Sequence, residues 1–312
     1  MSNLSFGIKY TPFPSRELGL CGLVDSIRAR HTLPILVATN GRSLPECARR
    51  RGATHVPCGL GLSAGRNALA RAAATKFLMI LDDDVAFTDR TDVFRLLAHV
   101  AERRADVAAA CYSGIRADSW ALLFSNACAA GWFVQAAAAA GTVRLQTPTG
   151  PDALRNASGV QKSHVVQNAF VARTLWLRAH RWDSRLQTAE DTLWFYQRYL
   201  QNDRVVFDPA VRLDHGGNKS TTADYNARST RYREAQYLQW MCKLVPSVRR
   251  WVLPFLTLDC DQRTVQRRYP ERMRFDTYWK RQLRNPISLA WTEDDCERNP
   301  FALRGAQTRA CR

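Results

Sequence analysis

Apolar runs of strand length alternate with helix-like stretches through the first third of the chain. The strand-like runs lie at residues 5–11, 33–39, 54–60, 76–82 and 106–115. Helical spacing is found near 19–30, from Ser63 onward in an alanine-rich stretch, and at 91–105. Ser63 is the expected N-cap of its helix. This alternation predicts an α/β fold in which helices cover both faces of a mainly parallel sheet.

The pattern loosens between about 117 and 165 and returns at 164–174 and 190–202, the latter with helical spacing. Beyond residue 246 the composition becomes basic and aromatic. We therefore expect one domain over 1–245 and a basic, helical extension over 246–312 packed on it. The sequence shows no clear linker between the two parts and no internal repeat.

An uncharged stretch at 119–143 is long enough to span a bilayer. Alanine dominates it and Ser, Asn, Gln and Gly interrupt it, so we expect a buried segment of a soluble domain. The first residues lack the features of a signal peptide, and the nine cysteines include no CxxC pair. Reduced thiols and a cytoplasmic, membrane-peripheral protein are expected, or one from the Golgi lumen if an N-terminal anchor precedes this sequence.

The net charge of +17, from 45 Lys and Arg against 28 Asp and Glu, favours anionic partners. Nucleic acid, anionic membrane, nucleotide-sugars and acidic glycans all fit such a field. Arginines alternate with aromatic residues at 261–286. That composition serves packing on the domain, contact with an anionic membrane or acidic glycan, or single-stranded nucleic acid. Nucleic acid is the least favoured of these.

Three adjacent carboxylates, Asp82, Asp83 and Asp84, directly follow the apolar run at 76–82. They could form a solvated loop. Crowded carboxylates repel one another unless a cation or proton relieves the repulsion, and Mg²⁺ or Mn²⁺ commonly bridges a carboxylate to substrate phosphates. Ligands of parallel sheets bind at the carboxyl ends of the strands, where this cluster falls.

Three further features favour a phosphate site over separate structural roles. The segment 59–67, GLGLSAGRN, offers glycines, helix N-terminal amides and the cation of Arg66 to a phosphate, although it could be an ordinary capped helix. Glu190 and Asp191 begin a helix, as caps or as a general base. His215 lies after a strand and before two glycines, as a structural residue or a metal ligand.

In order and spacing, these motifs resemble family 2-like glycosyltransferases of the GT-A fold, and most closely the ganglioside-type β1,4-N-acetylgalactosaminyltransferases. The resemblance covers roughly residues 5–218 and is carried by GLSAGRNALARAAATKFLMILDDDVAF and VVQNAFVARTLWLRAHRWDSRLQTAEDTLWFYQR. It implies a Rossmann-like, mixed and mainly parallel sheet. Residues 1–116 would form the nucleotide-sugar half and 117–245 the acceptor half.

The resemblance also implies the donor and metal residues. Asp82 and Asp84 match the outer positions of a DxD motif, with Asp84 the direct ligand of Mn²⁺ or Mg²⁺ and His215 completing the metal site. Asp83 would face the ribose or support the ligands. Arg66 and Asn67 match a donor-binding turn.

Other positions implied by the resemblance border the nucleotide or act in catalysis. Lys9 and Thr11 would lie beside the nucleotide, where Asn40 replaces the family's uracil-binding Asp. Asp191 would be the catalytic base, and Glu190 would orient the acceptor.

The resulting expectation is a metal-dependent, inverting transfer of a sugar from a nucleotide-sugar to a hydroxyl of a glycan, glycolipid or glycoprotein. UDP-linked hexose or N-acetylhexosamine is the favoured donor, although Asn40 weakens the case for uracil. A basic nucleic-acid-binding protein and a GT-A nucleotidyltransferase are the alternatives.

Overall fold

The computed structural model describes residues 3–12, 14–40, 43–59, 61–113, 159–166, 168–184 and 190–215. It also gives the backbone of four strands, β7 (Phe133–Ala137), β8 (Thr142–Gln146), β12 (Arg250–Leu253) and β13 (Leu256–Asp259). Most of the expected acceptor half and of the 246–312 extension, and most of the uncharged stretch 119–143, therefore lie outside the described residues. Among the described helices, none is both long and apolar enough to cross a membrane.

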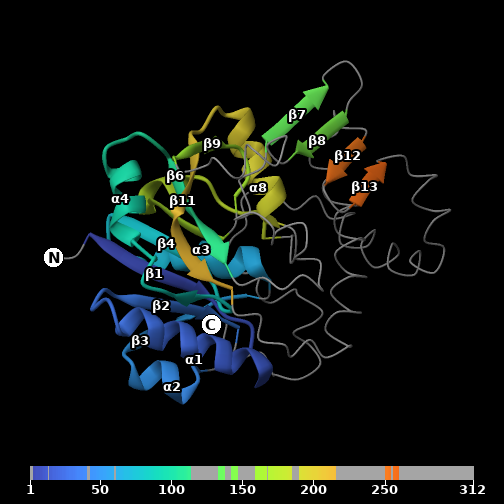
Figure 1. Ribbon diagram of the computed structural model, residues 1–312. Coiled ribbons are helices and arrows are strands. Elements are labelled where there is room, and N and C mark those ends of the chain that lie inside the picture. Colours follow the sequence, from blue (N-terminus) through green and yellow to red (C-terminus); the bar gives the residue numbers. More distant parts are fainter. Residues whose placement is uncertain are drawn as a thin grey trace, which may run out of the picture.

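A nine-stranded sheet forms the centre of the molecule (Figure 1). Its strands are β1 (Leu4–Lys9), β2 (Ile35–Thr39), β3 (Ala53–Pro57), β4 (Phe77–Asp82), β5 (Ala86–Phe87), β6 (Val107–Ser113), β9 (Gln161–Ser163), β10 (Ala169–Arg173) and β11 (Val205–Asp214). The order is β3-β2-β1-β4-β10-β6-β11-β5, and β9 also pairs with β11. The first four strands are mutually parallel, as are β6 and β11, whereas β10 runs antiparallel to both its neighbours.

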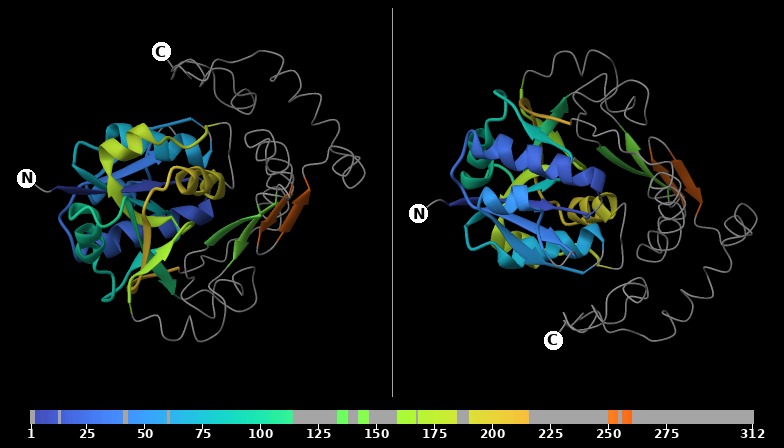
Figure 2. Two further views of the ribbon diagram at one scale, coloured as in Figure 1. Left: turned by 90° about the horizontal axis from the view of Figure 1, so that it is seen from above. Right: turned by 90° about the horizontal axis from the view of Figure 1, so that it is seen from below.

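Helices cover both faces of this sheet, as the sequence predicts (Figure 2). One face carries α1 (Pro14–Arg28), α2 (Glu46–Arg50) and α4 (Val93–Ala101); the other carries α3 (Leu62–Ala72), α7 (Thr174–Ala179) and α8 (Glu190–Leu200). Because successive side chains of a strand point to opposite faces, Met79 and Leu81 of β4 join the first core and Leu78 and Ile80 the second. This two-sided burial explains why the strands read as continuous apolar runs.

The carboxyl ends of the parallel strands meet at one edge of the sheet. Lys9, the last residue of β1, lies in register with Asp82, the last of β4. Beyond the antiparallel β10, Ser113 at the end of β6 lies in register with Asp214 at the end of β11. Residues that follow these strands are therefore brought together at that edge.

The N-terminus of α3 differs from the expectation. Gly61, not Ser63, is the N-cap, and its φ of 94° lies in the left-handed region that glycine tolerates. Ser63 instead lies inside the first turn with its hydroxyl buried. No side chain caps the first amides of the helix, because the glycine that makes the sharp entry has none to offer.

The C-terminal residues that the structure describes are strands and not helices, which corrects the expectation of a helical extension for 250–253 and 256–259. β12 pairs with β8 in parallel and with β13 in antiparallel, and β7 pairs with β8. This second sheet joins residues on both sides of the boundary expected at 245. The alternation of apolar and polar side chains in LTLD was an available strand signal.

A disulfide joins Cys21 of α1 to Cys47 of α2, with their Cα atoms 5.7 Å apart. The expectation of reduced thiols is wrong for this pair. The sequence carries no spacing motif for this pair. The two cysteines come together only when α1 and α2 pack on the same face of the sheet. Cys58, on the loop after β3, is a free thiol.

Candidate active site

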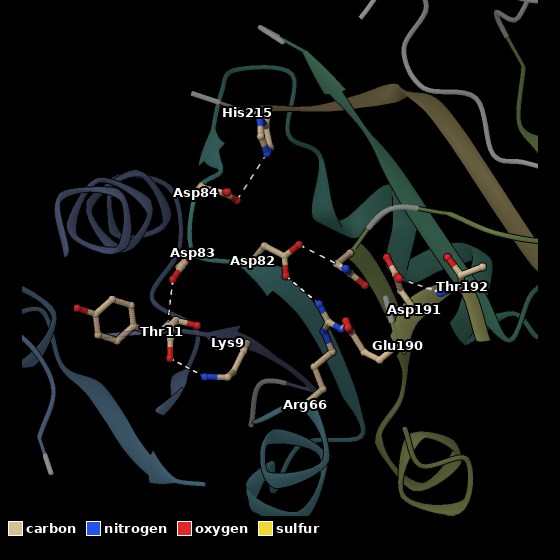
Figure 3. A network of polar contacts seen from close by, with 12 residues as sticks. Lys9, Thr11, Arg66, Asp82, Asp83, Asp84, Glu190, Asp191, Thr192 and His215 are labelled. Carbon is tan, nitrogen blue, oxygen red and sulfur yellow. Dashed lines mark hydrogen bonds and ion pairs between the residues drawn. The ribbon is translucent and has the colours of Figure 1, made fainter. Parts of the chain in front are cut away.

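The three adjacent carboxylates point in different directions at the end of β4 (Figure 3). Asp82 accepts a hydrogen bond from Arg66 at 3.0 Å and one from the amide of Asn168 at 3.3 Å. Burial raises the pKa of Asp82, and Asp84 raises it further against the lowering effect of Arg66. Asp82 is thus tied to the α3 side of the site.

Arg66 is completely buried between two carboxylates. Its guanidinium donates to Glu190 at the start of α8 as well as to Asp82. Burial alone would lower the pKa of Arg66, but Glu190 and Asp82 outweigh it and raise the pKa, so the residue stays charged. An enclosed guanidinium with both ends engaged holds the two chain segments together; it does not face a ligand in this arrangement.

Glu190 is almost as completely enclosed, with an exposed side-chain fraction of 1%. Burial raises its pKa to about 7, and the neighbouring Asp191 adds to the shift while Arg66 opposes it. One of its oxygens lies on Arg66, and the other has no hydrogen-bond partner among the described residues. The geometry gives Glu190 a contact with Arg66; its expected contact with an acceptor stays a prediction.

Asp83 turns toward α1. It accepts a hydrogen bond from the backbone amide of Thr11 at 3.1 Å and another from Arg16. Burial raises the pKa of Asp83 to about 6 even though Arg16 lowers it. Asp83 thereby fixes the loop after β1, the segment expected to border the nucleotide.

Asp84 points toward His215 (Figure 3). One oxygen lies 3.6 Å from Nε2 of His215, and the other accepts from Arg16 at 3.1 Å. Asp84 lies in the turn after β4 and His215 directly follows β11, so the sheet brings together two residues that are distant in sequence. Arg16 spans Asp83 and Asp84 and is 27% exposed.

The side chains available as metal ligands can be compared with the expected metal site. In the described part of the chain, no group of three His, Cys, Asp or Glu side chains is arranged to hold a metal ion by itself. Asp84 and His215 do face each other, whereas Asp82 is bound to Arg66 and Asn168. One carboxylate and one imidazole fit the protein's share of a cation that takes its remaining ligands from phosphate and water.

Asp191 lies beside this network at the start of α8 and is half-buried. Its Oδ1 accepts a hydrogen bond from the backbone amide of Thr192 at 2.8 Å. Its charge contributes to the raised pKa values of Glu190 and Asp82, which shows that the three carboxyl groups are electrostatic neighbours. A partly exposed carboxylate, of which one oxygen accepts no hydrogen bond from the described residues, suits proton transfer better than the enclosed Glu190 does.

Lys9 packs against α3 beside the site. Its ammonium donates to the carbonyl of Tyr10 at 2.6 Å, and burial lowers its pKa. A Cβ on Gly65 would come 2.0 Å from Lys9 Cδ. The glycine therefore lets the lysine stem lie directly on the helix backbone.

Asn67 and Asn40 do not join the network. The side chain of Asn67 donates to the carbonyl of Trp182 at 2.8 Å and accepts from its amide at 3.0 Å, a double hydrogen bond that fixes the loop after α7. Asn40 is exposed directly after β2, at the ligand-binding edge but one strand away from Lys9. Their expected contacts with a donor stay predictions.

Sequence reasoning did not select Arg16, Tyr112 or Asn168, which the structure places in or beside the network. Arg16 follows the KYTPF segment, so an arginine near the carboxyl end of the first strand was an available sign. Asn168 stands in the VVQNAF run that carries the resemblance, just before a strand. Tyr112 gave no local sign, because it belongs to an apolar strand.

Part of the chain matches a known protein family. Residues 53–126 match the family model described as Glycosyl transferase family 2. The matched segment includes β3, α3, β4, α4 and β6, hence Arg66 and all three carboxylates of the turn. The mixed, mainly parallel sheet with helices on both faces is the GT-A architecture that the sequence leads us to expect.

Two solved structures are also similar to the chain. One is the crystal structure of S. aureus TarS 1-349 in complex with UDP-GlcNAc, at 14% identity and a TM-score of 0.46, over 66% of this chain and 56% of that one. The other is S. aureus TarS, at 12% identity and a TM-score of 0.44, over 76% and 40%. The chain thus spans about half the length of these proteins or less. No curated protein matches the sequence.

Proposed function

We propose that the protein is a metal-dependent, inverting glycosyltransferase that moves a sugar from a nucleotide-sugar to an acceptor hydroxyl. The observation that carries the proposal is that Asp84 faces His215 at the carboxyl edge of the sheet, with Asp191 on the other side of Asp82 (Figure 3). Asp84 and Asp82 belong to the segment that matches the family 2 model. A UDP-linked hexose or N-acetylhexosamine is the donor we favour. The acceptor is a glycan, glycolipid or glycoprotein.

On the donor side, Asp84 and His215 would hold Mn²⁺ or Mg²⁺ together with oxygens of the diphosphate. The bound cation would neutralise the charge that develops on the departing nucleoside diphosphate. Asp82 supports this arrangement indirectly, because its hydrogen bonds to Arg66 and Asn168 fix the turn that presents Asp84.

Arg16 is the residue we assign to the diphosphate in place of Arg66. The guanidinium of Arg66 is fully buried between Glu190 and Asp82. Arg16 is partly exposed and already lies against Asp83 and Asp84. An arginine in that place matches phosphate oxygens in both charge and geometry.

On the acceptor side, Asp191 is the general base. It takes a proton from the acceptor hydroxyl as that oxygen attacks the anomeric carbon opposite the leaving diphosphate, so the configuration inverts. Glu190 and Arg66 hold Asp191 in position, because their buried ion pair fixes the first turn of α8 against α3 and β4. The backbone amide of Thr192 sets the direction of the Asp191 carboxylate.

Hydrolysis of a panel of nucleotide-sugars tests the proposal without knowledge of the acceptor. We expect slow release of the nucleoside diphosphate from one donor class with Mn²⁺, and none with a chelator. Thermal stabilisation by that nucleoside diphosphate plus Mn²⁺ should accompany it. Absence of both effects, together with tight, salt-sensitive binding of RNA, would instead support the nucleic-acid-binding alternative that the charge of +17 allows. Release of inorganic pyrophosphate from a nucleoside triphosphate and a sugar phosphate would indicate the nucleotidyltransferase.

The positive charge also bears on location. We propose a peripheral contact with an anionic membrane, since such a surface both attracts a basic protein and carries glycolipid acceptors. Co-sedimentation with vesicles of anionic and of zwitterionic lipid tests it. Equal binding to both would contradict an electrostatic contact.

A further inference from the structure

Tyr112 presents a buried hydroxyl that nothing in the described part of the chain satisfies. The residue is on β6, next to last in the strand, and only 5% of its surface is exposed. Its Oη has no hydrogen-bond partner among the described residues. Buried tyrosine hydroxyls normally find a partner, because an unpaired buried donor lowers stability. This one therefore calls for a specific explanation.

The contacts of Tyr112 place it beside the candidate active site. Its ring packs on the imidazole of His215, with ring centroids 5.2 Å apart and planes 32° from parallel. β6 and β11 hold the two residues together, since Tyr112 lies in register with Leu213, two residues before the histidine. The ring therefore supports the face of the residue that we assign to the metal.

The hydroxyl itself lies within the field of the carboxylates. The carboxylates of Asp82 and Asp84 lie close enough to act on it electrostatically. A phenol has an ordinary pKa of about 10, so the hydroxyl is protonated near neutral pH and can donate a hydrogen bond. This hydroxyl has no partner among the described residues and lies beside the proposed diphosphate site. It can therefore donate a hydrogen bond to an oxygen of a bound ligand.

We propose that Tyr112 is a substrate-contacting residue whose hydroxyl donates a hydrogen bond to an oxygen of the bound nucleotide-sugar. The inference rests on the proposed function and adds a residue to it. Oxygens of the diphosphate and of the transferred sugar share the required chemistry. A hydroxyl that the described residues leave unpaired gains its partner on binding, so it contributes to affinity or turnover and not to stability.

Tyr112→Phe tests the proposal because it removes the hydroxyl alone and keeps the ring on His215. We expect donor hydrolysis to lose about tenfold in kcat/KM, the effect of one hydrogen bond to a polar ligand. The melting temperature of the unliganded variant should stay the same or rise. Tyr199→Phe is the matched control, because Tyr199 lies at the far end of α8, where its ring contacts that of His164. It should leave hydrolysis unchanged.

Two binding measurements separate the possible partners. If the hydroxyl contacts the diphosphate, Tyr112→Phe weakens the thermal stabilisation by UDP with Mn²⁺. If it contacts the sugar, UDP binds as in the wild type and only the UDP-sugar is affected. Either result supports the proposal.

An active wild type with a Tyr112→Phe variant of equal kcat/KM overturns the inference and leaves the proposed function standing. A structural role would show as a lower melting temperature with unchanged kinetics, and that too overturns it. A wild type that neither binds nor hydrolyses any nucleotide-sugar refutes the proposed function and this inference together.

Discussion

Arg66 and Glu190 are 124 residues apart in sequence and form a hydrogen-bonded ion pair with neither side chain appreciably exposed. Removing one member of such a pair leaves an uncompensated buried charge. Glu190→Ala should therefore destabilise the protein by about 3 kcal/mol, measured by urea unfolding. Glu190→Gln also removes the charge but keeps an oxygen that can accept a hydrogen bond from Arg66, so it should lose less than Glu190→Ala. Equal losses in the two variants would show that the carboxylate charge is what matters.

Asp191→Asn tests the general base. An amide cannot take the proton from the acceptor hydroxyl, so transfer should fall by about 10²-fold or more. The melting temperature and the stabilisation by donor and Mn²⁺ should stay near wild-type values, because the amide oxygen can still accept from Thr192. Asp89→Asn, in the exposed turn after β5, is the control. Turnover within a few-fold of the wild type would rule out Asp191 as the base.

Asp84→Ala should abolish the added thermal stabilisation that Mn²⁺ gives in the presence of a nucleoside diphosphate. The reason is that Asp84 and His215, 3.6 Å apart, are the two protein groups we assign to the cation. His215→Ala should weaken the same effect less, since a carboxylate is the stronger ligand for hard cations. Calorimetric titration of Mn²⁺ into protein with excess UDP measures both. An unaltered Mn²⁺ affinity in Asp84→Ala would contradict the assignment.

The contacts of Asn67 predict that its substitution lowers the stability of the protein. The resemblance predicts instead that it weakens binding of the nucleotide-sugar. The two hydrogen bonds of Asn67 to the backbone of Trp182 are buried, and Asn67→Ala would leave a buried amide and carbonyl without that partner. The expected loss is about 1–3 kcal/mol in free energy of unfolding. Donor KM should change little. A large rise in donor KM with normal stability would instead favour direct contact with the nucleotide-sugar.

Asp208, which joins β11 to α4, should make the stability of the protein depend on pH in the acid range. Its enclosed carboxylate accepts from Arg95 at 2.6 Å, His99 at 3.0 Å and the amide of Ala210 at 3.1 Å. Burial opposes ionisation, but these partners together lower the pKa of Asp208. The stabilisation is therefore present above the ordinary Asp pKa of about 3.9 and is lost as the pH falls through the lower folded value.

Thermal unfolding of the wild type and of Asp208→Asn measures this effect. The wild type should be the more stable of the two near neutral pH, and the difference should shrink below about pH 4. A difference that stays constant with pH would show that Asp208 acts only through packing.

Much of the fold could be predicted because its signals are local. The apolar run before Asp82 is a strand because both faces of β4 are covered, and the carboxylates follow it at the edge where ligands bind. The position of Gly61 as N-cap was missed because Ser63, the stronger side-chain cap, stands two residues later. The cap was decided by backbone geometry, since only the glycine adopts the positive φ of the entry turn.

The partners of the site residues could not be predicted in the same way. The sequence shows that Arg66 is a cation near a helix start, but not that Glu190 and Asp82 enclose it. Likewise it shows an asparagine beside that arginine, but not that Trp182 engages it. These contacts depend on where α7 and α8 pack, which is decided by the core of Phe170, Trp182 and Trp194 and not by the motif.

The reversed direction of β10 has a consequence for where functional residues are sought. Every other strand in the middle of the sheet brings its final residues to the ligand-binding edge, whereas β10 brings its first ones. Ala169 therefore lies beside Leu81, while Arg173 lies beside Phe77 at the opposite edge. Asn168 reaches Asp82 because it precedes its strand. In a sheet of mixed direction, the residues that enter a reversed strand are equivalent in position to those that leave a parallel one.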